Sequence, residues 1–379
     1  MKRVKVAIPV QQRSYEIAIG SGLLPQLGQK LRRGLRGQGN RAVIISNPRV
    51  FSLLGDIVAG SLSKEGFSVA HWLMGEGERF KSLRTLERAV AFLSSEKLER
   101  NDLVIALGGG VVGDLAGFAA AVYLRGIPFV QVPTTLLAQI DSSVGGKTGV
   151  NLATGKNLVG AFHQPAAVII DTETLDTLPA RELTAGWCEA VKNGAVGSRP
   201  LFDQTVRFLQ SRQPGEGKHS SRQLEAVIAA QCAFKAAIVA GDERESLNRH
   251  DHRSRRILNF GHTVGHALES VTRYRRFRHG EAVGHGMIVA GELSKNLGLL
   301  APKELELLRA AIRLCGPLPA ASDVDEDAIM EVTTRDKKSV AGQINWILLE
   351  RLGRARIVAG KEIDQKVLRA ALRQALKPS

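Results

Sequence analysis

The chain has few cysteines and few aromatic residues, and each shortage argues against a class of protein. Only three of the 379 residues are cysteines, Cys188, Cys232 and Cys315, and no two of them form a C-x-x-C pair. This spacing fits neither a disulfide framework nor a zinc–thiolate site, so we expect a reducing, cytoplasmic environment. Aromatic residues make up 5% of the chain and do not alternate with basic residues, as they would in a protein that stacks single-stranded nucleic acid.

Long apolar runs are also scarce. The basic start of the chain is not followed by an apolar segment, because Gln11, Gln12 and Arg13 interrupt it. This argues against a signal peptide. We expect no stretch long enough to span a bilayer, and we find no internal repeat or low-complexity segment. The sequence therefore predicts a soluble protein without a membrane partner.

The net charge of +15 could indicate a nucleic-acid partner, since basic faces neutralise phosphates. The densest basic stretches, residues 249–256 and 273–278, fall in expected loops. Together with the low aromatic content, this favours a basic surface with some lysines and arginines drawn into a site for an anionic small molecule. We expect no nucleic-acid partner.

The first part of the chain alternates strand and helix patterns. Apolar, β-branched strands are expected at residues 42–45, 67–72, 103–107, 129–132 and 167–170. Helices are expected at 23–35 and 50–65, and a third helix is expected to end near residue 96. Residues 5–8 and 15–19 are expected to form an opening hairpin. The alternation predicts a parallel sheet with ligands at the strand carboxyl ends. Ser46, Asn47, Glu78 and Lys81 fall at such ends, although each alone is more often a helix cap or surface residue.

Helical periodicity dominates after residue 178. Helices are expected at 181–196, 201–209, 222–239, 280–297 and 303–314, and only 344–349 and 355–358 have strand patterns. The fold class is therefore α/β, with a mainly parallel sheet in a first domain, residues 1–178, and a mostly α-helical second domain, residues 179–379. At this length the chain can bury a core in each.

A glycine turn organises the first domain. The strand at 103–107 runs into Gly108-Gly109-Gly110 and then into an expected helix, an arrangement that lets backbone N–H groups approach a phosphate. Residues 108–113 match G-x-G-x-x-G formally, but the next strand lacks the terminal acid of a dinucleotide fingerprint. A helix packed tightly on a strand would explain the glycines equally well. The neighbouring Asp114, Thr134, Thr135 and Lys147 favour a nucleotide site of different design, and residues 141–151 are expected to be a ligand-binding loop.

Histidines gather in the second domain. His262 and His266 are four residues apart on one face of an expected helix. Together with a carboxylate such as Glu189 they suit a catalytic zinc, although a hydrogen-bonded core pair has the same spacing. Spacing alone makes His262 and His266 the ligand pair, and His163 and His285 are lesser candidates.

Taken together, these motifs resemble the 3-dehydroquinate synthase family of sugar phosphate cyclases. The matches run in order from about Ser46 to Lys338, and they are Gly77-Glu78-x-x-Lys81, Gly108 to Gly110 with Asp114, Tyr123 to Gly126, Pro133 to Ala138, Asp141 to Asn151, Gly155 to Asn157, Glu189-Ala190-x-Lys192, Leu258 to Glu269, His279 to Glu281, and Asp336 to Lys338.

The resemblance implies a Rossmann-like first domain, a metal-binding helical domain and a homodimer. It implies NAD and one divalent metal ion, zinc or cobalt, as cofactors. The metal would be bound by Glu189, His262 and His279, which overrides the spacing argument and makes His266 a substrate contact. Implied NAD contacts are Asn47, Glu78, Lys81, Gly109, Gly110, Asp114, Thr134, Thr135, Asp141, Lys147, Lys156 and Thr177. Implied substrate contacts are Asp141, Lys147, Asn157, Lys192, Lys235, Arg255, Asn259, His266 and one of Lys337 or Lys338, with Arg125 reaching a phosphate across the dimer interface.

The implied substrate is a seven-carbon sugar acid phosphate, whose phosphate and carboxylate suit basic side chains. NAD would oxidise one hydroxyl transiently, phosphate would leave by β-elimination, and the hydride would return before aldol closure. Related cyclases and metal-dependent polyol dehydrogenases are the nearest alternatives. One departure from the family stands out, since a basic insert, residues 246–254, separates Glu245 from Arg255. The insert leaves the register of Arg255 and Lys235 open.

Overall fold

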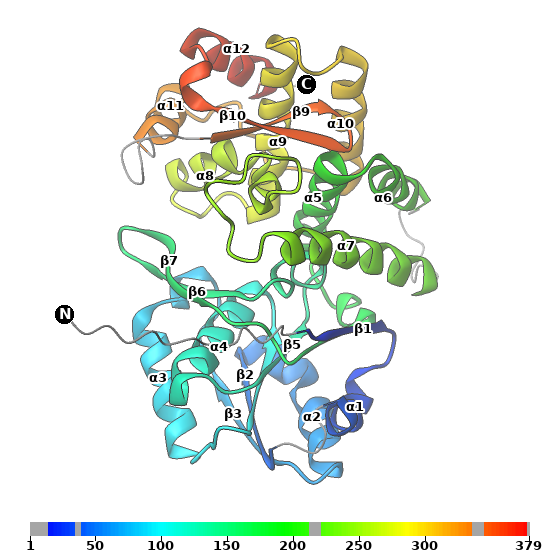
Figure 1. Cartoon of the computed structure of the whole chain (residues 1–379), viewed down its shortest axis with the longest axis vertical. Coiled ribbons are helices and arrows are strands. Elements are labelled where there is room, and N and C mark those ends of the chain that lie inside the picture. The colour runs from blue at the N-terminus through cyan, green and yellow to red at the C-terminus, as the bar shows by residue number, and fades with distance from the viewer. Residues whose placement is uncertain (1–13, 35–38, 212–220, 336–344, 377–379) are drawn as a thin grey trace, which may run out of the picture.

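The computed structural model describes residues 14–34, 39–211, 221–335 and 345–376. A six-stranded sheet lies in one half of the molecule and helices fill the other (Figure 1). Its strand order is β1-β8-β5-β4-β2-β3, and every pairing is parallel, as the alternating pattern predicted. The strands are β1 (Glu16–Gly20), β2 (Arg41–Ser46), β3 (Ser68–Leu73), β4 (Leu103–Gly108), β5 (Phe129–Pro133) and β8 (Ala167–Asp171). In the expected opening hairpin, residues 5–8 lie outside the described residues, and β1 pairs in parallel with β8.

Alternating side chains cover the two faces of the sheet. On β2, Val43 and Ile45 pack with the helices α3 (Leu83–Ser95) and α4 (Gly110–Val122). Ala42 and Ile44 pack on the other face with α1 (Leu27–Gly34) and α2 (Pro48–Lys64). Because successive strand residues point to opposite faces, a continuous apolar run is what a sheet covered on both sides requires.

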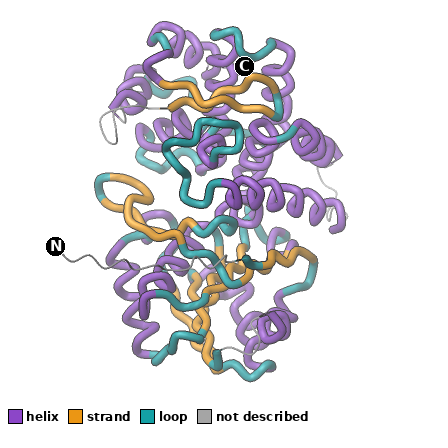
Figure 2. The backbone as a smooth tube through the Cα atoms, viewed as in Figure 1, coloured by secondary structure: helices purple, strands orange, loops and turns teal. Residues whose placement is uncertain are grey.

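The expectation of a ligand loop at residues 141–151 is partly wrong. Its second half forms β6 (Lys147–Leu152), which pairs antiparallel with β7 (Gly155–Phe162) in a separate hairpin. Within the hairpin, Gly149 and Gly160 allow the two strands to approach closely: a Cβ at Gly160 would lie 2.1 Å from the Thr148 carbonyl oxygen. Figure 2 shows this hairpin between the sheet and the helical half.

The described part of the second half contains the five helices predicted from periodicity, the helix expected to carry His262 and His266, and two helices that were not predicted. The helices are α5 (Ala180–Gly197), α6 (Arg199–Ser211), α7 (Ser221–Gly241), α8 (His262–Val271), α9 (His279–Asn296), α10 (Pro302–Cys315), α11 (Glu326–Arg335) and α12 (Gln365–Leu376), of which α11 and α12 were not predicted. The two expected strands are β9 (Asn345–Arg351) and β10 (Arg354–Ala359), which pair antiparallel.

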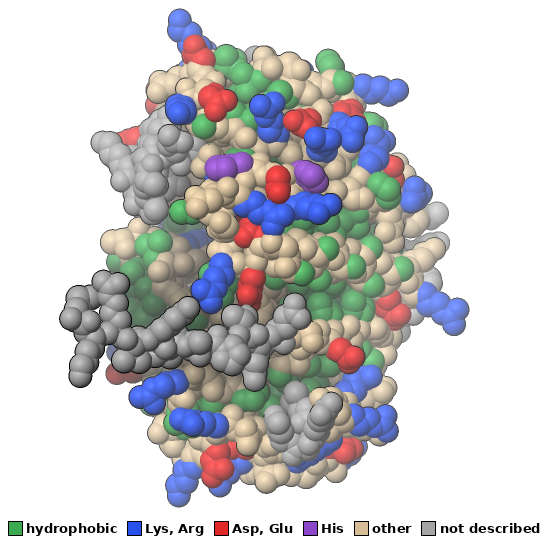
Figure 3. All heavy atoms as spheres, in the orientation of Figure 1, with side chains coloured by type: hydrophobic (Ala, Val, Ile, Leu, Met, Phe, Trp, Pro, Cys, Tyr) green, Lys and Arg blue, Asp and Glu red, His purple; other side chains and the backbone are tan. Residues whose placement is uncertain are grey.

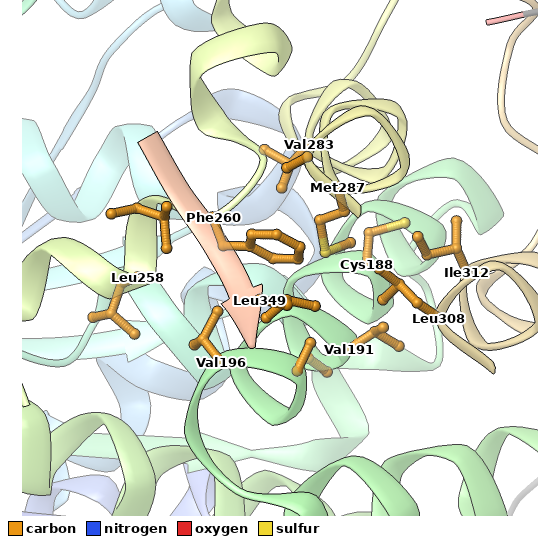
Figure 4. Packing of buried hydrophobic residues seen from close by; sticks show 14 of the residues in the cluster. Cys188, Val191, Val196, Leu258, Phe260, Val283, Met287, Leu308, Ile312 and Leu349 are labelled. Atoms are coloured by element: carbon orange, nitrogen blue, oxygen red, sulfur yellow. The ribbon is translucent and has the colours of Figure 1, made fainter. Parts of the chain in front are cut away.

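The helical half packs around α5. Cys188 and Val191 of this helix lie in one buried cluster with Phe260, Met287 and residues of every helix from α5 to α12. Figure 4 shows the Phe260 ring among these side chains. The cluster also takes in residues of the first half, such as Leu136 and Ile170. We keep a domain boundary at residues 178 and 179 as a proposal, supported by the end of β8 at residue 171 and the start of α5 at residue 180.

Helix α7 corrects the expectation that no segment could span a bilayer. By length and composition alone, Arg222–Gly241 could do so, and 39% of an apolar 18-residue window within it is buried in the structure. A core helix meets the same criteria. Val227, Ile228 and Cys232 of α7 belong to the shared core, and Lys235 contacts Asp141 of the first half.

Candidate active site

The glycine turn caps α4. Gly109 is the N-cap and Gly110 the first helical residue, so the free N–H groups of the first turn face the end of β4. A Cβ at Gly109 would lie 3.0 Å from Thr135 Cγ2, and one at Gly110 would lie 2.9 Å from Ser142 Oγ. The N–H of Thr134 donates to the Gly108 carbonyl at 3.0 Å. Small side chains and N–H groups therefore meet at a helix start, which suits a dinucleotide phosphate.

Lys81 joins predicted cofactor and substrate residues into one cluster. It is buried, and its Nζ lies 2.5 Å from both Asp114 Oδ2 and Asn157 Oδ1. Burial alone would lower the pKa of Lys81, but the carboxylates of Asp114 and Glu78 raise it above its ordinary value. Glu78 accepts a hydrogen bond from Asn151 Nδ2 at 2.8 Å. A charged ammonium is thus fixed between the helix start and the β6–β7 hairpin.

Three predicted residues lie apart from this cluster. Asn47 caps α2, with its Oδ1 accepting from the Val50 N–H at 3.0 Å. Thr177 lies in an exposed turn before α5, and Arg125 is exposed at the end of a short 3₁₀ turn. Within the described chain, no hydrogen bond joins Thr177 or Arg125 to the other predicted residues. The roles predicted for these residues remain predictions.

Asp141 ties the two halves together. Lys235 of α7 donates to the Asp141 side chain and also to its backbone oxygen at 2.7 Å, and Lys192 Nζ of α5 lies 3.8 Å from Asp141 Oδ2. Burial alone would raise the pKa of Asp141, but these two ammonium groups lower it below its ordinary value. Burial lowers the pKa of Lys235, and Asp141 offsets part of that effect. Two buried lysines are therefore held at one carboxylate.

The hairpin meets the second half at a further group of polar residues. Lys147 forms an ion pair with Glu245, which also accepts from Asn259 Nδ2 at 3.1 Å. Arg255 Nη2 donates to the Gly145 carbonyl at 3.0 Å, so the predicted Lys147, Asn259 and Arg255 do come together. Glu245 was not among the predicted residues, although it directly precedes the insert.

The basic insert leaves Arg255 in the site because Asp242 holds both of its ends. Asp242 Oδ1 accepts from the Ser246 N–H at 2.8 Å, and Oδ2 accepts from the buried Arg255 N–H at 2.9 Å. The insert residues between these two anchors form a surface loop. The face seen in Figure 3 mixes Lys, Arg, Asp, Glu and His side chains across the middle of the molecule.

Loss of the two hydrogen bonds that Asp242 accepts should destabilise the fold. Asp242→Ala would leave the buried Arg255 N–H without its acceptor, so we expect the free energy of unfolding to fall by about 1–3 kcal/mol. Urea denaturation measures this value. Asp251→Ala, which removes an exposed carboxylate from the same insert, should change it much less. Equal losses in the two variants would show that Asp242 does not anchor the insert.

A metal-binding arrangement lies where α5, α8 and α9 converge. One ring nitrogen from each of His262, His266 and His279 lies within 4.8 Å of the others. Glu189 Oε1 lies 3.9 Å from His262 Nε2 and 3.7 Å from His279 Nε2. The structure thus brings together the ligand pair expected from spacing and the set implied by the resemblance. His163 and His285 face the backbone oxygens of Ile127 and Pro319 and lie outside this three-histidine group.

The donors suit a zinc or cobalt ion. Both carboxylate oxygens of Glu189 are buried. Lys192 pairs with Oε2, and among the described residues Oε1 has no hydrogen-bond donor. A divalent ion would satisfy such a carboxylate. Burial, with the nearby Lys192, holds the pKa of His262 well below its ordinary value and keeps the imidazole neutral, as a ligand must be. Carboxylate oxygen and imidazole nitrogen are ordinary ligands for catalytic zinc.

Each histidine beside Glu189 also has an outer partner. His262 Nδ1 lies 3.2 Å from the Phe260 carbonyl oxygen, and His279 Nδ1 lies 3.3 Å from Glu269 Oε2. Burial alone would raise the pKa of Glu269, but His279 and Lys156 lower it to about 2. Lys156, predicted to bind the cofactor, lies 3.1 Å from Glu269 Oε1. Sequence reasoning gave Glu269 no role, because a carboxylate at the end of a helical motif is usually a surface residue.

Comparison with known proteins shows the family to which the chain belongs. Residues 71–185 match the 3-dehydroquinate synthase N-terminal family model, and residues 186–339 match the corresponding C-terminal model. A 3-dehydroquinate synthase from Gloeobacter violaceus is 44% identical over 375 residues, which is 98% of this chain and 99% of the relative.

Two solved structures are similar over nearly the whole chain. A 2-epi-5-epi-valiolone synthase from Streptomyces hygroscopicus, with NAD+ and Zn2+ bound, is 28% identical, with a TM-score of 0.84 over 98% of this chain and 99% of that one. A 2-deoxy-scyllo-inosose synthase, complexed with carbaglucose-6-phosphate, NAD+ and Co2+, is 25% identical, with a TM-score of 0.78 over 95% and 96%. With both family models matched and a full-length relative of this identity, the chain belongs to the 3-dehydroquinate synthase family.

Proposed function

We propose that the protein converts 3-deoxy-D-arabino-heptulosonate 7-phosphate into 3-dehydroquinate and phosphate. The observation that carries this proposal is the position of Lys192. Its buried ammonium is paired with both Glu189 of the metal-binding group and Asp141 beside the glycine turn. A single lysine therefore links the expected metal and cofactor sites, which is where a substrate that contacts both must bind.

The cofactors are NAD and one divalent ion, as in the two related cyclase structures. NAD would lie at the start of α4, and Glu189, His262 and His279 would bind zinc or cobalt. When bound, the two cofactors accept and return one hydride and polarise the hydroxyl that is oxidised.

The protein side chains supply binding and proton transfer. Charge-assisted hydrogen bonds would hold the phosphate and carboxylate of the substrate. The residues that would make them are Lys147, Lys192, Lys235, Arg255, Asn259 and Asn157. Oxidation of one hydroxyl to a ketone acidifies the neighbouring C–H. That proton would leave as the C–O bond to phosphate breaks, and we assign its relay to His266. The hydride that NAD supplies would reduce the ketone again, and ring opening and an aldol reaction would then close the carbocycle, so that there is no net redox change.

Catalytic use of NAD tests this proposal against the nearest alternative, a polyol dehydrogenase. We expect phosphate release from the heptulosonate phosphate with NAD at a small fraction of the substrate concentration. No NADH absorbance at 340 nm should accumulate, because the hydride is returned in each cycle. NADH formed in proportion to product would show a dehydrogenase instead. A sister cyclase would release no phosphate from this substrate.

We further propose that the enzyme is a cytoplasmic homodimer. Its three cysteines are buried and free, which fits a reducing compartment. Val122 and Leu124 are 44% and 41% exposed; Val122 precedes the 3₁₀ turn that ends at Arg125, and Leu124 lies within it. A partner surface there would cover the apolar side chains and place Arg125 near the partner's phosphate site. Sedimentation velocity tests the dimer, and a monomer at micromolar concentration would contradict it. Lys337 and Lys338, one of which is expected to contact substrate, lie outside the described residues.

A further inference from the structure

Glu269 of α8 contacts two parts of the site, the metal-binding histidines and the β6–β7 hairpin. Its side chain is buried, and its two oxygens contact different elements. Oε2 lies 3.3 Å from Nδ1 of His279 on α9, and Oε1 lies 3.1 Å from Nζ of Lys156 on β7. Neither contact belongs to the cofactor and substrate contacts that the family resemblance implies.

The contact with His279 determines which ring nitrogen can bind a metal. A hydrogen on Nδ1 donates to Glu269, so the lone pair is on Nε2, which lies 3.7 Å from Glu189 Oε1. His262 has the equivalent arrangement with the neutral Phe260 carbonyl at 3.2 Å. A carboxylate partner makes an imidazole a stronger ligand than a neutral partner does, and it fixes the orientation of the ring.

The contact with Lys156 brings the β6–β7 hairpin to the same carboxylate. The Lys156 ammonium also lies 4.2 Å from the centre of the Tyr274 ring, just beyond α8. Lys156 therefore has two partners in the helical half and is 28% exposed, whereas the Glu269 side chain is 5% exposed. Because the Glu269 carboxylate contacts both His279 and Lys156, loss of its charge would affect both side chains.

We propose that Glu269 is a positioning residue that fixes His279 for metal binding and attaches the β6–β7 hairpin to the metal centre through Lys156. This inference rests on the metal site of the proposed function. The competing explanation is a buried ion pair that only stabilises the fold.

Metal affinity separates these explanations, and Glu292 provides a matched control. The Glu292 side chain on α9 is 5% exposed, like that of Glu269, and it pairs with Lys295 and Arg309 away from the histidines. Apo protein is titrated with Co2+ in competition with a chelating indicator. We expect Glu269→Gln to weaken Co2+ binding by about 10- to 100-fold, the usual cost of losing a ligand's outer partner. Glu292→Gln should bind Co2+ as the wild type does.

Hydrogen exchange measures the second contact. In the Co2+-loaded protein, amides of residues 147–162 should exchange faster in both Glu269→Gln and Lys156→Met than in the wild type, and at the wild-type rate in Glu292→Gln. If Glu269→Gln does not fold, Glu269→Asp takes its place, because it keeps the charge and shortens the reach. Wild-type Co2+ affinity in the folded variant, or an equal loss in Glu292→Gln, overturns the proposal. Neither measurement uses substrate, so its outcome is independent of whether the protein releases phosphate in the cyclase assay.

Discussion

Removing any one of Glu189, His262 or His279 is expected to abolish metal binding. A catalytic ion with three protein ligands retains too few when one is lost. Loss of an outer partner costs up to about 100-fold in affinity, so loss of a direct ligand should cost more than that. Metal analysis of each purified alanine variant after dialysis, together with phosphate release, measures the effect. Metal and activity should disappear together.

Glu189 needs a second variant because of its neighbour. Lys192 is 1% exposed and is paired with Glu189, so Glu189→Ala leaves a buried cation with a more distant carboxylate. That change is destabilising in itself. Glu189→Gln keeps the shape and removes the ligand charge, and Glu292→Gln again controls for loss of a buried carboxylate. A full equivalent of metal bound with native affinity in any one variant would remove that residue from the ligand set.

The sequence predicted the sheet more completely than it predicted the site. The parallel strands could be predicted because each is a continuous apolar run, as in Leu103–Gly108. Such a run is typical of a strand in a sheet that is covered on both faces. The hairpin at residues 147–162 was missed because its glycines also fit a loop. In the structure, glycine is required because Gly149 and Gly160 lie close to the backbone of the opposite strand. That contact forms only when the two strands pair, so the sequence alone could not show it.

Within the site, sequence spacing could detect only local neighbours. His262 and His266 share a helix face, and the structure does place them together. Glu189 and His279 come from other helices, so motif resemblance and not periodicity identified them. Glu245 and Glu269 were missed because an acidic residue is usually on the surface, and only the folded chain shows Lys147 and Lys156 beside them. Asn47 is the reverse case. It was predicted to bind the cofactor, and in the structure its side chain caps α2, while the cofactor contact remains a prediction.

His266 is the residue on which spacing and family resemblance disagree. Its ring lies 5.3 Å from that of His262 and 5.7 Å from that of His279, centre to centre, so geometry permits it to be a ligand. Two observations favour a substrate role. His266 is exposed, whereas Glu189 is fully buried and its Oε1 has no hydrogen-bond donor among the described residues. An exposed imidazole beside a metal is placed to exchange a proton with a bound substrate.

His266→Ala is therefore expected to retain nearly stoichiometric metal while turnover falls by about 100-fold or more, the scale of a general acid–base group. The loss should appear in kcat, because a proton relay acts in the transition state and contributes little to ground-state binding. His250→Ala, a histidine on the exposed insert, should change neither quantity. Metal content decides between the two roles, since loss of a ligand removes metal and activity together. An apo His266→Ala protein would make His266 a ligand and would leave the buried Glu189 carboxylate to be explained by Lys192 alone.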